Sequence, residues 1–547
     1  MSKPRLIAPA VFILAAVFYM ITLLPSVAWG DGIKLQSEAI TGESFVLSEM
    51  TDEEFSPDAF VFSKVGVAAW DHPLYIMLGY VLVRTFSFVD ALWLINFLSA
   101  FFGAASIALV YMLSHRYTGS FMASCYAAFS LAVSHTFWWH SSTPEVYTLF
   151  AFLLLASLYF FDRFERTRRH PFLFLSGMFL GLAASNHMLA FLALPAVALY
   201  YLLFRGFRVP ARLEAQNLIY PSLGFLTGFL VYLIQFARMA RSFPLAEIMG
   251  PVVGMTFLSR LGGLDISLLA KSLVTFLFLL AVQFNPIGVI LGAHGIRGIF
   301  RSERYSRKIL ACFIAFSLFG VFYQVSDQFA FFLSAYVFWS LMMGIGVDHF
   351  LSGLRKNIRL ISYGALGLLI LGTPLFYAAL PGLAKRAGLD DASAGIPQIG
   401  VGLRDGLSYY INPDKRGDFS AYDFGQQTVA GLAPEALVLA EWYTDTDEYF
   451  VLRYFVAVEG LRPDVTIVGW PAHDPFSFDS RLALDVIEDA LPGRPVYLAS
   501  LSDHFYASGQ LVEKYCILPE DNLYRLYPRG AGGAGMHQSG CIRSISE

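Results

Sequence analysis

The chain begins with an apolar stretch that predicts a membrane helix and is followed closely by a carboxylate. Residues 6–24 read LIAPAVFILAAVFYMITLL, and residues 25–31 read PSVAWGD. The apolar run is long enough to cross a bilayer core, which takes roughly 17 to 25 residues. A carboxylate at the mouth of such a helix is costly unless it faces water or a ligand. Asp31 is therefore a candidate functional residue.

The composition is typical of a membrane protein. Of the 547 residues, 56% are hydrophobic and 15% are charged, which is more apolar surface than one soluble core of this length would bury. A net charge of -4 argues against a nucleic-acid partner. The basic start at Lys3 and Arg5 resembles a signal peptide, but no small-x-small cleavage pattern precedes Asp31. We therefore predict that the first helix is retained.

Further apolar runs predict a mainly α, polytopic membrane protein with eleven transmembrane helices. A twelfth candidate, residues 73–89, is interrupted by Arg84, and we predict that it is re-entrant or interfacial. The predicted spans are 6–27, 92–113, 119–137, 145–161, 171–187, 188–204, 217–236, 272–296, 309–325, 329–348 and 358–379.

Basic residues between the predicted spans indicate how the chain is oriented in the membrane. Four basic groups fall on the same side as Lys3 and Arg5 only if residues 73–89 do not cross. The positive-inside rule then places the N-terminus in the cytoplasm and the C-terminus outside, and we expect a bacterial inner membrane. The four groups are Arg163, Arg166, Arg168 and Arg169; Arg205, Arg208 and Arg212; Arg297, Arg301, Arg304, Arg307 and Lys308; and Arg355, Lys356 and Arg359.

The composition becomes polar near Pro381, which predicts a domain boundary. Residues 1–380 form the predicted transmembrane domain, with a first extracytoplasmic loop over 28–72, and residues 381–547 form an extracytoplasmic domain. In that domain a strand, helix and strand pattern predicts a small α/β fold. The three elements are expected at residues 436–440, 447–458 and 465–468.

The four cysteines are too few for a disulfide scaffold, and none has the spacing of a zinc site. Cys516 and Cys541 are the two that lie outside the apolar spans. If the C-terminal domain lies in an oxidising compartment, we expect them to form a disulfide across the glycine-rich segment 530–540.

Polar residues beside the predicted spans collect on the predicted outer side. Three are arginines in the loop predicted over residues 238–271. Positive charge in an outer loop is unusual, because Lys and Arg are normally more frequent in cytoplasmic loops. An anionic lipid headgroup would supply a reason for them. The polar candidates are Asp31, Lys34, Asp71, His72, His140, Glu145, Asn186, His187, Asp327, Arg238, Arg241 and Arg260.

Several of these residues stand in short motifs. The motifs are Trp29-Gly30-Asp31, His72-Pro73-Leu74, Pro144-Glu145-Val146-Tyr147, the stretch from Gly181 to His187 (GLAASNH), Tyr323-x-x-x-Asp327 and, in the C-terminal part, Glu459 to Val465 (EGLRPDV). Together they resemble the polytopic proteins related to protein O-mannosyltransferases, within the GT-C glycosyltransferase superfamily. The resemblance covers most of the predicted membrane part.

The resemblance implies a GT-C-like fold, a polyprenyl-phosphate sugar as donor, and a reaction on the extracytoplasmic face. It also implies that the aspartate after the first helix, Asp31, is the general base. Many relatives read Asp-Ser-Gly-Glu where this chain has Asp31-Gly32-Ile33-Lys34. The difference removes a second carboxylate from this loop, and we expect Lys34 to meet an anion instead.

The residue types fit that chemistry independently. Transfer from a lipid phosphate to a hydroxyl needs a base near the acceptor proton and cations near the phosphate. Asp31 fits the base, and Glu145 is the second catalytic candidate, although a carboxylate at that helix start would also complement the helix dipole. We predict no protein-bound metal and no cofactor besides the donor. The predicted substrate-binding residues are Lys34, Asp71, His72, His187, Asp327, Arg238, Arg241 and Arg260.

A transporter or flippase of a lipid-linked or small polar substrate is the alternative function. Such a protein should show polar residues through the whole bilayer depth, or inverted repeats. Here the polar residues concentrate at one face, which favours the enzyme. The expected partners are the lipid bilayer, the polyprenyl-phosphate sugar, and a hydroxyl of a protein or an envelope glycan as acceptor.

Overall fold

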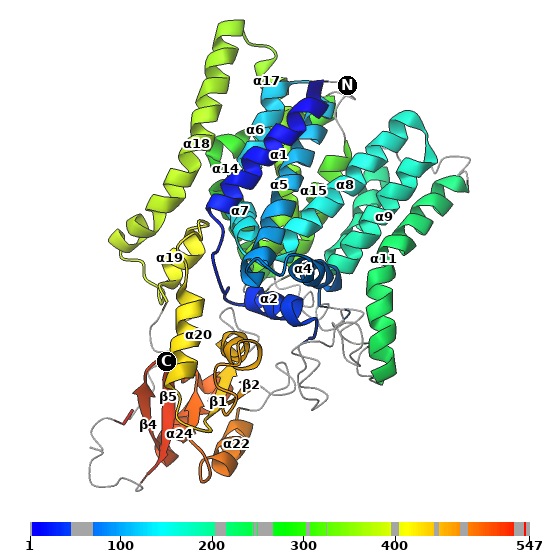
Figure 1. The fold of residues 1–547 in the computed structure, drawn as a ribbon. Helices are drawn as coiled ribbons and strands as arrows, with labels where there is room; N and C mark the ends of the chain where they lie inside the picture. The colour runs from blue at the N-terminus through cyan, green and yellow to red at the C-terminus, as the bar shows by residue number, and fades with distance from the viewer. Residues whose placement is uncertain are drawn as a thin grey trace. The chain divides into compact units, whose positions relative to one another are not determined.

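The computed structural model describes residues 3–44, 69, 71–202, 215–242, 244–245, 249, 266–301, 307–323, 325, 327–394, 396, 404–441, 448–470, 480–529 and 541–542. Over these residues the chain is mainly helical, and a small sheet forms in its C-terminal part (Figure 1). The predicted mainly helical chain with a small C-terminal sheet is therefore confirmed.

The chain divides into two compact units. The helical unit comprises Met1–Leu23, Phe60–Pro381 and Ile411–Arg416. The sheet unit comprises Leu24–Ala59, Gly382–Tyr410 and Gly417–Glu547. The residues that follow the first helix therefore belong with C-terminal residues that are far away in the sequence.

The helical unit is built from long apolar helices and several short ones that connect them (Figure 1). They are α1 (Lys3–Ile21), α4 (Pro73–Thr85), α5 (Ala91–Thr118), α6 (Phe121–Ala132), α7 (His135–Ser142), α8 (Val146–Thr167), α9 (His170–Asn186), the 3-10 helix η1 (Met188–Leu192), α10 (Ala193–Tyr200), α11 (Gln216–Ser242), α14 (Ile266–Arg301), α15 (Arg307–Phe322), α16 (Gln328–Phe331), α17 (Leu333–Leu351) and α18 (Lys356–Arg386).

Local sequence signals set the ends of several helices. Asp90 precedes α5 and accepts a hydrogen bond from the Trp93 N–H at 2.8 Å. Gly119 ends α5 with a φ of 70°, and Ser120 then starts α6 by accepting from the Ala123 N–H at 3.3 Å. Polar N-caps and a left-handed glycine at the C-terminus are common ways to satisfy the backbone at helix ends. The tight turn between them packs α6 against α5.

Two helix pairs touch through their backbones at glycines. A Cβ on any of these glycines would overlap a backbone carbonyl oxygen of the facing helix. Small residues spaced four apart allow such close approach, which is how membrane helices often associate. The glycines are Gly177 and Gly181 of α9 against Gly224 and Gly228 of α11, and Gly295 of α14 against Gly346 of α17.

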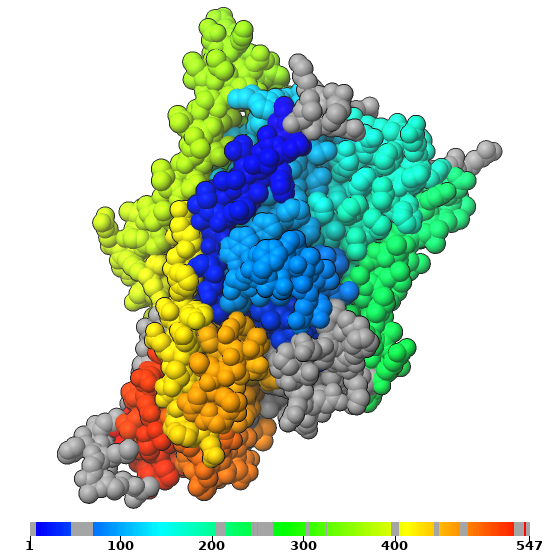
Figure 2. All heavy atoms as spheres, viewed as in Figure 1, coloured from blue at the N-terminus to red at the C-terminus, as the bar shows by residue number. Residues whose placement is uncertain are grey.

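The outer surface of the helical unit is strongly apolar. Ile13 and Leu14 of α1 are 57% and 59% exposed, and α1 crosses the face seen in Figure 2 in dark blue. Leu371 of α18 is 72% exposed. Exposed apolar side chains along long helices are expected where lipid covers a protein.

Five helices among the described residues are long and apolar enough to cross a membrane, namely α5, α8, α11, α14 and α18. The eleven crossings expected from the sequence remain a prediction. The 13 residues of α4 span about 20 Å, which is shorter than the hydrocarbon core of about 30 Å. That length agrees with a segment that does not cross.

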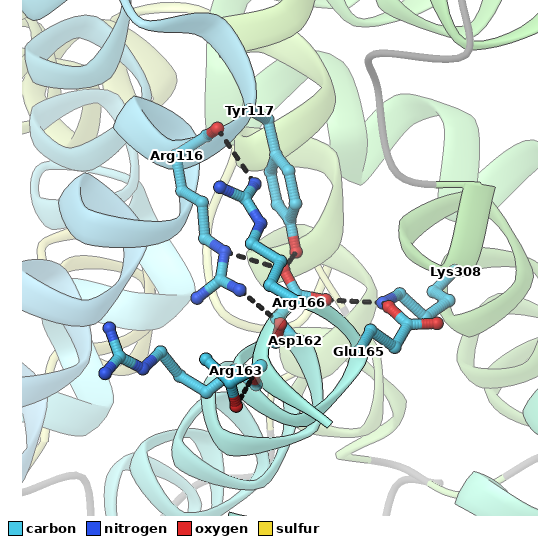
Figure 3. A network of polar contacts seen from close by, with 8 residues as sticks. Arg116, Tyr117, Asp162, Arg163, Glu165, Arg166 and Lys308 are labelled. Atoms are coloured by element: carbon cyan, nitrogen blue, oxygen red, sulfur yellow. Dashed lines mark hydrogen bonds and ion pairs between the residues drawn. The ribbon is translucent and has the colours of Figure 1, made fainter. Parts of the chain in front are cut away.

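A buried charge network joins three helices at one end of the helical unit (Figure 3). Asp162 of α8 accepts a hydrogen bond from the Tyr117 hydroxyl at 2.6 Å and lies 3.5 Å from the Arg116 Nε. Lys308 of α15 pairs with both Asp162 and Glu165. The side chain of Asp162 is 5% exposed and that of Lys308 is 12% exposed. The network therefore fixes the C-terminal ends of α5 and α8 to the start of α15.

The sheet unit contains a five-stranded mixed sheet in the order β2-β1-β3-β5-β4. β1 runs parallel to β2 and β3, whereas β5 runs antiparallel to β3 and β4. Its elements are α2 (Asp31–Thr41), α19 (Gly406–Ile411, which ends in the helical unit), α20 (Ser420–Gly431), β1 (Leu437–Glu441), α21 (Glu448–Arg453), the π-helix η4 (Tyr454–Val458), β2 (Thr466–Trp470), α22 (Leu482–Ala490), β3 (Val496–Leu498), α23 (Asp503–Tyr506), α24 (Ser508–Lys514), β4 (Tyr515–Glu520) and β5 (Leu523–Pro528).

Two predictions about this unit are confirmed. The predicted strand, helix and strand correspond to β1, α21 with η4, and β2, and the two strands are parallel. Cys516 and Cys541 form a disulfide. The bond ties the segment after β5 to β4. The core of the unit includes Leu439, Ile487 and Leu498.

Candidate functional site

His72 stands at the start of α4 in an uncommon backbone conformation. Its φ of 55° and ψ of 46° are left-handed, a region that non-glycine residues seldom occupy and that often marks functional sites. Its Nδ1 lies 2.8 Å from the Asn186 carbonyl oxygen. Since a carbonyl can only accept, Nδ1 carries a proton and donates it. The turn and this bond together orient the ring.

His187 lies in the turn between α9 and η1, as the sequence predicted for this hinge. Its Nδ1 accepts a hydrogen bond from the Leu189 N–H at 3.1 Å, so the neutral ring has its proton on Nε2. The ring centroids of His72 and His187 are 5.0 Å apart. The two imidazoles are therefore neighbours with fixed orientations, and His187 presents an Nε2–H donor.

Rings from three other helices surround this pair. Tyr147 of α8 lies 5.4 Å from the His187 ring centroid, and Phe331 of α16 lies 6.2 Å from it. His140 of α7 lies 5.1 Å from Tyr147. Burial lowers the pKa of His140 to about 3, so this ring is neutral. We call His72, His140, Tyr147, His187 and Phe331 the histidine cluster.

Asn186 contributes a buried polar group next to the cluster. Its Nδ2 donates to the Val146 carbonyl at 3.0 Å, while its Oδ1 is buried and has no hydrogen-bond partner within the described parts of the chain. Buried polar atoms are nearly always paired, so an unpaired one invites a functional explanation. A ligand hydroxyl or N–H is the kind of group that Oδ1 could accept from.

Glu145 is held by its backbone at the start of α8. Its N–H donates to the Ser99 Oγ at 2.9 Å, and the Ser99 hydroxyl lies 3.0 Å from its carbonyl oxygen. The Tyr75 hydroxyl lies 2.8 Å from the same Ser99 Oγ. The Glu145 side chain is half-buried, and its residue adjoins Val146, to which Asn186 is bonded. Glu145 therefore lies at the same end of the helical unit as the histidine cluster.

Two more predicted acidic residues lie at this end. Asp71 immediately precedes His72 and is 6% exposed. Asp327 caps the short helix α16 and is half-buried. Because α16 contributes Phe331 to the histidine cluster, both aspartates are close in sequence to a member of it.

Lys415 was not predicted from the sequence. It lies in the segment 411–416 that returns to the helical unit, and its backbone N–H donates to the Thr22 carbonyl at 3.0 Å. Its side chain is 2% exposed, and its Nζ lies 5.6 Å from the ring centroid of Trp139. Trp139 in turn adjoins His140, with 5.0 Å between ring centroids. A buried cation therefore stands beside the histidine cluster.

The predicted arginine loop is corrected by the structure. Arg238 and Arg241 lie in the last turns of α11, not in a loop. The Ala-Arg-Met-Ala-Arg sequence explains this, because these are all strong helix formers that extend the apolar helix. Arg238 is half-buried and Arg241 is exposed. Arg260 lies outside the described residues.

Asp31 and Lys34 belong to the sheet unit, and their predicted loop is also corrected. They lie in α2, where Asp31 is the first residue and is exposed. Gly42 ends this helix with a φ of 83°. An acidic first turn and a C-terminal glycine are helix signals, but the short, mostly polar sequence concealed them. The Lys34 Nζ lies 6.0 Å from the ring centroid of Phe450 in α21.

The tryptophan of the Trp-Gly-Asp motif anchors α2 within the sheet unit. The Trp29 Nε1–H donates to the Ser420 Oγ at 2.8 Å, and its ring lies 5.3 Å from that of Phe424. The Arg404 guanidinium lies 5.8 Å from the Trp29 ring centroid. Gly30 then turns the chain with a φ of 64°. The motif thus sets where Asp31 begins the helix.

The helical unit gathers the predicted residues His72, Glu145 and His187 at one end, along with the unpredicted Lys415. Among the described residues, no three His, Cys, Asp or Glu side chains form a group that could hold a metal ion. These side chains can donate hydrogen bonds to oxygen atoms of a ligand and accept hydrogen bonds from its hydroxyl groups. The Lys415 ammonium can lie near an anionic group of the ligand.

Part of the chain is similar to a known protein family. Residues 71–208 match the family described as protein O-mannosyl-transferase TMEM260 N-terminal domain. This segment includes His72, Glu145 and His187. No curated protein matches the sequence.

Solved structures with a similar fold cover nearly the whole chain. ArnT from Cupriavidus metallidurans bound to undecaprenyl phosphate is 13% identical, with a TM-score of 0.58 over 97% of this chain and 99% of that chain. The oligosaccharyltransferase AglB from Archaeoglobus fulgidus, in complex with an inhibitory peptide and a dolichol-phosphate, is 13% identical, with a TM-score of 0.52 over 98% of this chain and 76% of that chain. The resemblance seen in the motifs is confirmed at this level: residues 71–208 match the model of a protein O-mannosyl-transferase family, and the fold of the chain is similar to those of ArnT and AglB.

Proposed function

We propose that the protein is a membrane glycosyltransferase of O-mannosyltransferase type. It transfers a sugar from a polyprenyl-phosphate donor to a hydroxyl of a protein or an envelope glycan, on the extracytoplasmic face. Two observations support this most: the oriented histidine pair at one end of an apolar helical unit, and the buried Lys415, whose Nζ lies against Trp139 next to His140 of the histidine cluster.

The donor phosphate is assigned to the helical unit. The Lys415 ammonium and the His187 Nε2–H are the donors that would stabilise negative charge as the lipid phosphate leaves. The unpaired Asn186 Oδ1 would accept from a sugar hydroxyl. The similar ArnT and AglB structures hold undecaprenyl phosphate and a dolichol-phosphate, respectively, which supports a lipid-phosphate ligand for this fold.

Asp31 is assigned as the general base. As the acceptor oxygen forms a bond to the sugar C1, the C1–O bond to the phosphate breaks. The acceptor proton passes to the Asp31 carboxylate, and the lipid phosphate leaves with the bonding electrons. Glu145 is the second candidate for the base.

A transfer assay with a lipid-linked sugar tests this function. Purified full-length protein in nanodiscs is given undecaprenyl-phosphate [3H]mannose and a detergent extract of cell envelopes, and we expect a labelled product. Lys415→Gln should raise the donor KM by roughly 10- to 100-fold, because a charge-assisted hydrogen bond to the phosphate is lost. Lys514→Gln, which removes an exposed lysine paired with Glu488, is the matched control and should have no effect.

The alternative function gives a different result. A flippase would move the lipid-linked sugar between leaflets without forming a labelled product. Label transferred equally well from GDP-mannose in the same nanodiscs would exclude the lipid donor.

The proposed orientation is tested by thiol labelling of intact cells. In a Cys125→Ala, Cys312→Ala background, Glu513→Cys in the sheet unit should react with a membrane-impermeant maleimide. Arg169→Cys in the first of the four basic groups should react only after the membrane is permeabilised, because the positive-inside rule places that loop in the cytoplasm. Both positions are exposed in the structure. Labelling of Arg169→Cys in intact cells would overturn the orientation.

A further inference from the structure

The sheet unit has a topological switch point at the C-terminal end of β1. β1 lies between β2 and β3 and is parallel to both. The chain passes from β1 to β2 on one side and then crosses to β3 on the other side. In open α/β sheets, ligands bind outside the carboxyl ends of the strands at the point where the order reverses in this way.

A buried carboxyl group stands at this point. Glu441 is the last residue of β1 and is 3% exposed. The Ser500 hydroxyl, just after β3, donates to its Oε1. Its Oε2 is buried and has no hydrogen-bond partner among the residues that the structure describes. The Tyr506 hydroxyl donates to the Leu439 carbonyl at 3.1 Å and also interacts with the Glu441 carboxyl group.

A buried carboxyl group with an unpaired oxygen destabilises the folded protein, which is unexpected for a residue with only a structural role. Burial raises the pKa of Glu441, because the charged form is poorly solvated there. An apolar residue of similar size would avoid both the desolvation and the unpaired oxygen. Buried groups kept in such a state usually have a functional reason.

The geometry points to a binding site for a carbohydrate hydroxyl at the C-terminal ends of β1 and β3, with Glu441 Oε2 as the recognising atom. A hydroxyl both donates and accepts, so it can pair with Oε2 whether the carboxyl group is ionised or protonated. A peptide N–H can only donate. This inference rests on the proposed function and narrows it, since the acceptor would then be a glycan.

Binding of a simple glycoside to the full-length protein tests the site without requiring transfer. Saturation-transfer NMR in nanodiscs would use methyl α-D-mannopyranoside and, in parallel, the peptide acetyl-Ala-Thr-Ala-amide. Glu441→Met should bind the glycoside roughly 10- to 100-fold more weakly, because one hydrogen bond to a charged or polar carboxyl is lost. Glu441→Gln keeps a polar atom at the position of Oε2, so its affinity for the glycoside should fall less than that of Glu441→Met. Glu513→Met, an exposed glutamate of the same unit, should bind as the parent does.

Stability separates this role from a structural one. The midpoint of thermal unfolding of Glu441→Met should stay unchanged or rise, because a partly unpaired buried carboxyl is removed. A lower midpoint together with lost binding would make Glu441 structural, and unchanged glycoside binding would remove the site. Peptide binding that depends on Glu441 would overturn the carbohydrate assignment. Because the glycoside assay needs neither donor nor turnover, its failure is distinct from failure of the transfer assay.

Discussion

Replacement of Asp31 with asparagine should lower the rate of sugar transfer by about 10²- to 10⁴-fold, which is the usual contribution of a general base. Asparagine keeps the size of the side chain but cannot accept the acceptor proton. Asp31 is exposed at the first position of α2, so the lost charge should cost only about 0.5 kcal/mol of helix stability. Donor binding should be retained. Single-turnover transfer and donor binding, measured on the same preparation, check both parts.

A matched variant distinguishes the loss of a general base from the loss of a negative charge at a helix N-terminus. Asp503 is also an exposed aspartate at the first position of a helix in the sheet unit, and Asp503→Asn should transfer sugar at the parental rate. If Asp31→Asn transferred at a near-normal rate, Asp31 would be excluded as the base, and Glu145 would be the next candidate.

Asp162→Asn should destabilise the helical unit by about 3 to 5 kcal/mol, the typical cost of removing one partner of a buried ion pair. Asp162 is the shared partner of Arg116, Tyr117 and Lys308. Without the negative charge of Asp162, the largely buried cations of Arg116 and Lys308 would be only partly neutralised. Thermal unfolding of the detergent-solubilised protein should show a clearly lowered midpoint.

Glu165→Gln is the control for this network. Glu165 pairs with the same lysine, but its side chain is 32% exposed, so water can replace the lost partner. Loss of the Glu165 charge should lower the free energy of unfolding by less than about 1 kcal/mol. Equal destabilisation by the two variants would contradict the view that Asp162 is the central residue of the network.

The parts of the fold that were predicted correctly depend on local patterns. Long apolar runs indicated the helices, and two short apolar stretches, at 436–440 and 465–468, on either side of a helical pattern indicated the pair β1 and β2. The helix α2 was missed because its buried face contains polar residues such as Gln36 and Ser37, which do not register as an apolar stripe. The end of α11 was missed because its last turns are charged.

The site was predictable only where residues stand in motifs at helix ends. His72 and His187 were expected separately, but their contact joins α4 to the end of α9 and depends on tertiary packing. Lys415 had no local signal, since nothing in the sequence around it indicates that residues 411–416 pack with the helical unit. Glu441 could not be found from sequence for a similar reason, because its unpaired oxygen is defined by Ser500 and Tyr506 from distant segments.

The glycine contacts between α9 and α11, and between α14 and α17, would also restrict how the proposed lipid donor approaches. Backbones that touch leave no opening for a hydrocarbon chain, and an isoprene unit is bulkier than the methyl group that these positions already exclude. The tail of a polyprenyl-phosphate donor must therefore enter and leave through another part of the lipid-facing wall. These glycines would thus limit the routes by which the proposed lipid donor enters, although they have no side chain with which to bind it.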